Sequence, residues 1–226
     1  MKVNFSSIQR WAKIWVVLAL AAFNLLLFGA NAFAHHALGG KLPANAFEGF
    51  ISGLAHPIIG FDHFAFVVSI GLLAGTKRQG ISIAIAFVLT AMLGTGFHLI
   101  QLNLPAVELF VSGSVLFFGI LLAMKDSPNY IAIASFAALA GLFHGYAYGE
   151  AIFGAEMTPL ISYLAGFTAI QLIIATSAFL VGKAVLKQTE SEQSPLKLRF
   201  AGFVICGAGA AFLSSQIVSA IFPALT

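Results

Sequence analysis

All six histidines of the sequence are candidates for binding a transition-metal ion, because four lie in apolar segments and two are adjacent near the N-terminus. The apolar segments contain HPIIGFDH at residues 56–63, then His98, then FHGYAYGE at residues 143–150. Ionisable groups are costly inside a membrane and usually mark a site. Imidazole nitrogens bind zinc, copper, iron and nickel, and carboxylates add charge and orient the rings. These residue types therefore predict a divalent-metal site.

The first run sets limits on which groups can share an ion. His56 and His63 lie on one face of a helix, but a straight helix would hold them about 10 Å apart along its axis, which is too far for one ion. Pro57 and Gly60 between them can break or kink the helix. Asp62 points roughly 100° away from His63. We expect His63 and Asp62 near the ion, with His56 as a nearby capture or structural group.

The other two segments extend the candidate set. A hydrogen bond between helices explains an isolated His98 as well as a metal site does. His144 and Tyr148 share a helix face at a spacing of four residues. Tyr146 and Tyr148 are nevertheless expected in the aromatic belt at the membrane interface. Glu150, at the end of this segment, is a further candidate ligand.

The composition predicts the class of protein that must position these groups. Of 226 residues, 60% are hydrophobic and only 8% are charged, and the mean hydropathy is +0.98. Soluble domains carry roughly 25% charged residues. We therefore expect an all-α, polytopic transmembrane helical bundle, and we exclude a soluble globule, a disordered chain and a disulfide scaffold. Nucleic-acid binding is excluded because the sequence has no basic patch.

Residues 1–34 have the three parts of a secretory signal peptide. A basic start precedes the apolar stretch from Ile14 to Phe28, and Ala32-Phe33-Ala34 is a small-x-small cleavage signature. The alternative is an uncleaved membrane helix, but that needs roughly 20 apolar residues. We expect cleavage after Ala34, which leaves eight basic and eight acidic residues in the mature chain.

Cleavage would make His35 the first residue, followed by His36. A terminal amine, a deprotonated amide and imidazole nitrogens together suit nickel-type and copper-type ions. A solvated polar tail is the alternative, and the pair by itself does not decide between them.

From residue 35 onward the pattern predicts one transmembrane domain, 35–226. A moderately apolar lead-in at 43–54 is interrupted by Pro57. About six apolar runs follow, each of roughly 18–24 residues, the length that crosses a bilayer. They lie at residues 58–75, 80–101, 106–124, 130–149, 159–182 and 200–222. The polar segment 184–197 is expected to be a mobile cytoplasmic loop.

Basic residues predict the orientation of these spans. A cleaved signal places residue 35 outside, and six spans return the C-terminus to the same side. On this path Lys41 is the one basic residue of the mature chain outside, and the cytoplasmic side carries Lys77, Arg78, Lys125, Lys183, Lys187, Lys197 and Arg199. We therefore expect a bacterial-type inner (plasma) membrane protein with both termini periplasmic. The candidate metal residues of the spans then fall in the outer half of the membrane.

The pattern HPxxGxDH resembles the signature of the HupE/UreJ family of nickel and cobalt permeases, and FHGxAxG at residues 143–149 is similar to that family's other histidine motif. The similarity spans the entire mature chain. It implies a secondary transporter that takes up Ni²⁺ or Co²⁺ through one small membrane subunit. The implied site residues are His56, Asp62, His63 and His144.

The chain departs from the family pattern in the fourth span. Many members have a histidine where this chain has Tyr148, and their glutamate lies one position after Glu150. The start at His35-His36 is also similar to permeases that ligate metal through an N-terminal amine and an adjacent histidine.

The predicted function is import of Ni²⁺ or Co²⁺ by a permease that is not an enzyme and carries no prosthetic group. The ion is captured outside by His35 and His36 and then binds among His63, Asp62, His98 and His144. The partners are the ion and the lipid bilayer. Small residues suit contacts within one chain and between copies alike, so a homo-oligomer is an open alternative.

Two alternatives belong to other classes. An intramembrane zinc-dependent hydrolase would use bound zinc with a general base such as Glu150. A periplasm-facing metal sensor or accessory subunit would share the site but have no inward exit route. The permease is favoured over the hydrolase because no metalloprotease motif of the HExxH kind occurs.

Overall fold

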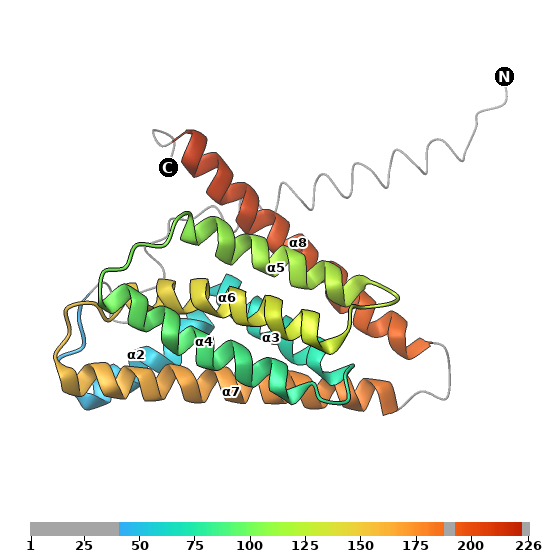
Figure 1. Cartoon of the computed structure of the whole chain (residues 1–226), viewed down its shortest axis with the longest axis horizontal. Helices are drawn as coiled ribbons and strands as arrows, with labels where there is room; N and C mark the ends of the chain where they lie inside the picture. The colour runs from blue at the N-terminus through green and yellow to red at the C-terminus, as the bar shows by residue number, and fades with distance from the viewer. Residues whose placement is uncertain (1–40, 188–192, 223–226) are drawn as a thin grey trace, which may run out of the picture.

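The computed structural model describes residues 41–187 and 193–222 of the chain. This part is entirely helical, with no strand among the described residues. The helices are α2 (Ala46–Ile59), α3 (Phe61–Gly75), α4 (Ile81–Leu99), α5 (Val107–Ala123), α6 (Tyr130–Glu150), α7 (Met157–Lys187) and α8 (Gln193–Ile221). Figure 1 shows them as an elongated bundle, with α8 lying obliquely across α5. The prediction of an all-α bundle is confirmed. The signal peptide expected at 1–34 lies outside the described residues.

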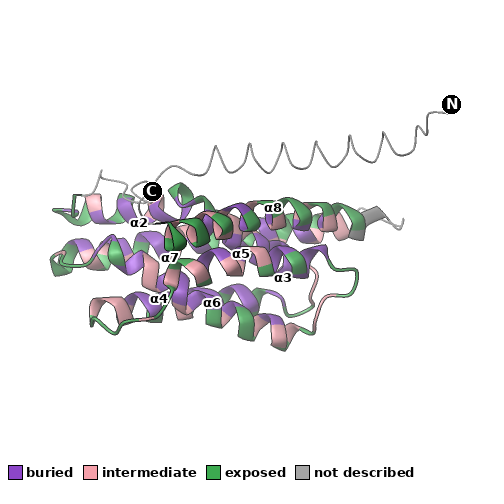
Figure 2. Ribbon diagram, turned by 90° about the horizontal axis from the view of Figure 1, so that it is seen from above, coloured by how far each residue is buried: buried purple, intermediate pink, exposed green. Residues whose placement is uncertain are grey.

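The helices have the length and composition of membrane spans. Four of them, α4, α6, α7 and α8, are long and apolar enough to cross a bilayer, and α2 with α3 passes the same test as one bent pair. The remaining apolar helix, α5, has 17 residues. Many large hydrophobic side chains are exposed on the surface of the bundle. Figure 2 colours the ribbon by the burial of each residue. The chain is therefore an integral membrane protein, while the count of six spans stays a prediction.

Helix boundaries follow the expected spans closely in the middle of the chain. α4, α5 and α6 each begin and end within two residues of the predicted runs. The polar segment expected as a loop at 184–197 is shorter, because α7 continues to Lys187 and α8 already begins at Gln193. Lysine and glutamine are good helix formers, and Pro195 lies in the first turn of α8, where proline is tolerated.

The lead-in and the first predicted span form a single broken element. Pro57 lies inside α2 and does not end it, so the interruption expected at Pro57 occurs instead at Gly60. Gly60 adopts an extended conformation (φ −71°, ψ 93°) between the two helices. The axes of α2 and α3 then differ by 77°. This bend brings the end of α2 against the beginning of α3.

Glycines allow the helices that carry histidines to approach closely. A Cβ atom added at Gly94 of α4 would collide with the carbonyl oxygen of Leu142 on α6, and one at Gly145 of α6 would collide with the carbonyl oxygen of Ala91. Thr95 adds a hydrogen bond between the same helices by donating to the carbonyl of Gly145 at 2.7 Å. Backbone contact at these positions fixes the height of α6 relative to α4.

The pair Gly94 and Gly96 tests this packing directly. Gly94→Ala should lower the free energy of unfolding by about 1–3 kcal/mol, because its methyl group meets backbone that cannot move aside locally. Gly96→Ala is the matched control, because an added Cβ there has nothing within 4 Å. Helix propensity alone should leave that variant equal to the parent or stabilised by up to about 1 kcal/mol. Denaturant titration in detergent, followed by circular dichroism, measures both, and equal effects would contradict the packing argument.

Candidate functional site

Three histidines from three different helices meet inside the bundle. His56 near the end of α2 and His63 at the beginning of α3 are each 3% exposed, and His144 of α6 is fully buried. The ring centroids of His56 and His63 are 5.7 Å apart, and those of His63 and His144 are 4.9 Å apart. The break at Gly60 thus removes the separation of about 10 Å that a straight helix would impose. We call His56, His63 and His144 the histidine cluster.

Hydrogen bonds determine which nitrogen of His144 carries the proton. The hydroxyl of Ser114 lies 2.6 Å from the carbonyl oxygen of Val111 and donates its single proton there. It therefore accepts from Nε2–H of His144 at 2.9 Å. A neutral His144 then has its lone pair on Nδ1, since a charged imidazole would be costly in this buried position.

The same logic extends to His63. Its Nδ1 lies 2.7 Å from Nδ1 of His144, and two nitrogens at that distance share a proton. Because Nδ1 of His144 is the acceptor, His63 donates from Nδ1, and its lone pair is on Nε2. A directed chain of donors therefore runs from His63 through His144 and Ser114 to the carbonyl of Val111.

His56 is oriented by a separate partner on α7. The hydroxyl of Tyr163 donates to the carbonyl oxygen of Tyr148 at 2.9 Å, so it accepts from Nδ1–H of His56 at 3.0 Å. The lone pair of His56 is therefore also on Nε2. Two neighbouring imidazoles thus have the tautomer in which Nε2 is the metal-binding nitrogen.

Tyr148 lies between these rings, which corrects the expectation that it belongs to the interfacial belt. The side chain is fully buried, and its ring centroid is 4.5 Å from that of His63 and 5.1 Å from that of His56. Its hydroxyl has no hydrogen-bond partner among the described residues. A buried hydroxyl without a partner costs about 1–3 kcal/mol, so a polar occupant beside it would be stabilising.

Asp62 supplies negative charge one residue from His63. It is 8% exposed, and its Oδ1 accepts the backbone N–H of His63 at 2.8 Å. An acid in the first turn of α3 is favourable because helix N-termini carry partial positive charge. The carboxylate both stabilises the start of α3 and places a formal charge beside the histidine cluster.

His98 does not join the cluster. Its ring contacts within the described structure are with Tyr146 and Phe153, at centroid distances of 4.5 and 5.7 Å, and its Nδ1 is buried without a hydrogen-bond partner there. Glu150 is exposed at the end of α6. Both residues lie toward the end of α4 and α6 that is opposite the basic end. His35 and His36 fall outside the described residues.

The described residues contain no group of three or more His, Cys, Asp or Glu side chains already close enough to hold one ion. The chemistry on offer is instead a pair of imidazole lone pairs, a nearby carboxylate and a tyrosine hydroxyl. Phe66 stacks on His144, with 4.1 Å between the ring centroids. Phe66 belongs to the apolar core, so it marks the boundary between that core and the histidine cluster. Imidazole nitrogens are ligands that suit soft or borderline divalent cations.

Three residues of this arrangement were absent from the predicted site. Ser114 and Tyr163 act by fixing tautomers, and their signal in the sequence is weak because serine and tyrosine occur in many membrane helices. Tyr148 lies four residues after His144 on the same helix face, and this spacing was the signal in the sequence that its side chain could lie near the histidines.

Comparison with known proteins adds a family and one relative. The family described as HupE / UreJ protein matches residues 23–212 of the chain. Protein HupE from Rhizobium leguminosarum bv. viciae is 30% identical over 168 residues, which cover 74% of this chain and 85% of the relative. No solved structure matches.

Removal of the Tyr163 hydroxyl tests the assigned tautomer of His56. Tyr163→Phe should lower the free energy of unfolding by about 1–3 kcal/mol, because the carbonyl of Tyr148 and Nδ1–H of His56 both lose their partner. The ring nitrogen chemical shifts of His56, measured by ¹⁵N NMR, should change from one tautomer to a mixture. Tyr130→Phe is the control, since its hydroxyl makes no hydrogen bond within the described residues. An unchanged His56 tautomer would refute the role of Tyr163.

Proposed function

The chain belongs to the HupE/UreJ family, and on that premise we propose that it is a permease that imports Ni²⁺ or Co²⁺ through the histidine cluster. The ion passes from the periplasmic side to the cytoplasm of a bacterial-type cell. His56 and His63 are the primary ligands, His144 holds His63 in register, and Asp62 offsets the charge of the ion. The transported ion is the substrate, and no prosthetic group takes part.

The observation that carries this proposal is the matched tautomer of His56 and His63. Both rings bond protein groups through Nδ1–H, so the lone pair of each ring lies on Nε2, the tautomer that suits metal binding through Nε2. Metal-binding histidines commonly have their second nitrogen fixed in this way, which orients the ring and raises its basicity. A ring separation of 5.7 Å is of the size that one ion between two imidazoles requires, about 5–6 Å for metal–nitrogen bonds of about 2.1 Å.

The broken element of α2 and α3 supports transport over a purely structural role. Transporters often bind ions where a membrane helix is interrupted, because the ends of the two half-helices carry opposite partial charges. Here the C-terminal end of α2 carries His56, and the N-terminal end of α3 carries Asp62 and His63. The negative end of α2 and the carboxylate both favour a cation at the break.

The other candidate ligands are proposed to capture the ion before it reaches the histidine cluster. His98 and Glu150 lie nearer the expected periplasmic end than the cluster does, and we assign them, with His35 and His36, to capture. A potential that is negative inside favours inward movement of a divalent ion by about 4.6 kcal/mol per 100 mV across the full field. Conduction needs sites that are strong enough to bind and weak enough to release.

Uptake by proteoliposomes tests the proposal. Radioactive Ni²⁺ and Co²⁺ should each be measured with the purified full chain under an imposed inward-negative potential. His63→Ala should weaken ion binding by about 100-fold and abolish uptake at low ion concentration. His98→Ala is the comparison variant, because it removes a histidine assigned to capture and not to the cluster; it should leave ion binding close to that of the parent and reduce uptake far less.

The outcomes separate the candidate functions. Uptake by the parent chain that His63→Ala abolishes supports a permease with this site. Binding without uptake would overturn the permease and favour a sensor or accessory subunit. Equal losses of ion binding in His63→Ala and His98→Ala would overturn the assignment of the cluster as the binding site but not transport itself.

Tyr148→Phe separates a hydroxyl that faces the ion from one that stabilises the fold. The variant removes a buried group that has no partner among the described residues, so the metal-free protein should be as stable as the parent or more so. If the hydroxyl contacts the bound ion or its water, affinity should fall about 10-fold. Thermal unfolding without metal and isothermal titration with Ni²⁺ measure the two effects. Lower stability with unchanged affinity would contradict this role.

A further inference from the structure

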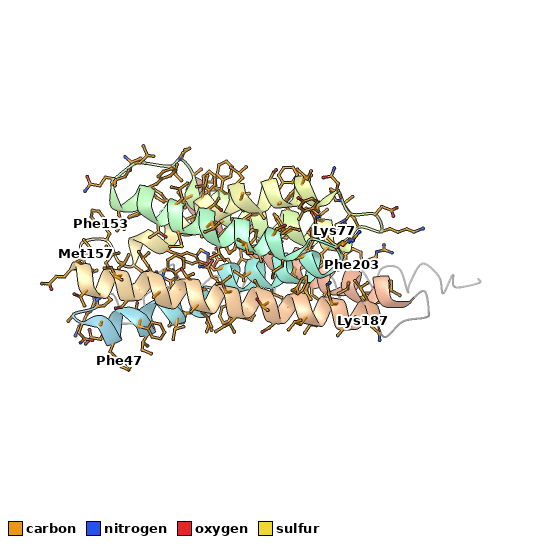
Figure 3. All side chains as sticks on the ribbon, turned by 60° about the horizontal axis from the view of Figure 1, so that its bottom comes forward. Phe47, Lys77, Phe153, Met157, Lys187 and Phe203 are labelled. Carbon is orange, nitrogen blue, oxygen red and sulfur yellow. The ribbon has the colours of Figure 1, made fainter. Side chains whose placement is uncertain are left out.

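A cavity of about 350 Å³ opens at the end of the bundle that carries the basic residues, far from the histidine cluster. It lies among the last turn of α3, the connection after α5, the end of α7 and the second turn of α8. Figure 3 shows this end of the molecule near the labels Lys77, Lys187 and Phe203, opposite Phe47 and Met157. The cavity has no part in the proposed metal site.

Three cations line the cavity against one acid. Lys77, Lys125 and Arg199 come from three separate segments, and Asp126 is the only carboxylate among the lining residues. Lys77 donates to the hydroxyl of Ser127 at 2.7 Å, while no ion pair to a carboxylate is present for these three cations in the described part of the chain. The cavity therefore carries an excess of two positive charges.

Two of these three cations make hydrogen bonds that stabilise the fold, and the third, Lys125, makes none within the described residues. The carbonyls at the ends of α3 and α5 carry partial negative charge. Arg199 compensates one of them by donating from Nε to the carbonyl of Ala123 at 2.8 Å, and Lys77 holds the connection after α5. Lys125 is exposed and makes no hydrogen bond or ion pair within the described residues. No described residue occupies its ammonium group, so an anion in the cavity can pair with it.

The walls of the cavity are apolar. Leucines from α3, α5, α7 and α8 line it, among them Leu73, Leu122, Leu186 and Leu198. A small hydrated anion gains nothing from such walls, whereas an acyl chain does. Basic pockets between membrane helices at the cytoplasmic side suit anionic lipid headgroups. We propose that this cavity binds an anionic phospholipid, with its phosphate at Lys77, Lys125 and Arg199 and part of an acyl chain against the leucines.

Lipid titration of the purified full chain tests this proposal independently of transport. Native mass spectrometry and the thermal midpoint should be measured in detergent with phosphatidylglycerol, phosphatidylcholine or inorganic phosphate. We expect retention and stabilisation by phosphatidylglycerol only. Lys125→Gln should weaken phosphatidylglycerol binding about fivefold, the contribution of one basic residue near an anionic headgroup. Its midpoint without added lipid should match the parent, because Lys125 makes no hydrogen bond or ion pair with the described residues.

Lys187→Gln is the matched control, since Lys187 is an exposed lysine at the same end that does not line the cavity. The site is supported if phosphatidylglycerol binding weakens in Lys125→Gln but not in Lys187→Gln. Binding should weaken further in the double variant that combines Lys125→Gln with Arg199→Gln. An equal loss in Lys187→Gln would overturn it in favour of general surface charge. Equal binding of phosphatidylcholine would overturn the requirement for negative charge, and equal stabilisation by inorganic phosphate would overturn the lipid as the occupant.

Discussion

The organisation of the histidine cluster depends on one constraint, which is that imidazoles buried among lipid-facing helices are oriented by hydrogen bonds to protein groups. Water is scarce at that depth, so a polar atom without a partner on a neighbouring helix is costly. His144 uses both ring nitrogens, one toward His63 and one toward Ser114. His56 uses Tyr163. These partners lie on α3, α5 and α7, so the cluster ties together helices that the apolar contacts alone would leave able to slide.

Close backbone packing makes those hydrogen bonds geometrically possible. His144 reaches His63 because α6 sits at a fixed height against α4, with Gly145 touching the backbone of Ala91. His56 reaches Tyr163 because Gly53, one turn earlier on α2, touches the backbone of α7 at the carbonyl of Tyr163 itself. In both cases a glycine lies within one turn of the histidine that it positions. The hydrogen bonds of the histidines therefore depend on the close helix packing that these glycines allow.

The sequence predicted the helical class, for clear physical reasons, and it singled out three histidines that the structure places close together. The length of an apolar run indicates directly whether it can span a membrane. Ionisable groups within such runs are rare, so each one is easily recognised as a candidate site residue. Pro57 and Gly60 were both recognised as residues that can break or kink the helix, and the structure continues α2 through Pro57 and breaks it at Gly60. His98 was grouped with the cluster because it falls in the same half of the predicted membrane, but this placement reveals neither the exact depth of a side chain nor the helix face that it occupies. Tyr148 was assigned to the interface for the converse reason, since its type suggested the membrane boundary while its face points inward.

The packing beneath the cluster determines what the proposed transport cycle must change. Phe66 stacks on His144 and also contacts Phe87 and Phe118, with ring centroids 5.3 and 5.0 Å apart. All three phenylalanines are almost completely buried and come from α3, α4 and α5. They lie between the histidines and the basic end and pack against one another there. In the proposed cycle, these rings would have to separate before an ion bound at the cluster could leave toward the cytoplasm. Phe66 and His63 belong to the same half-helix, so rotation of α3 about the break at Gly60 would release the aromatic contact and the imidazole ligand together. Because His63 and Phe66 lie on one rigid helix, a single movement would weaken ion binding at His63 and separate the phenylalanine rings. A permease requires such coupling between release of the ion and opening of its exit.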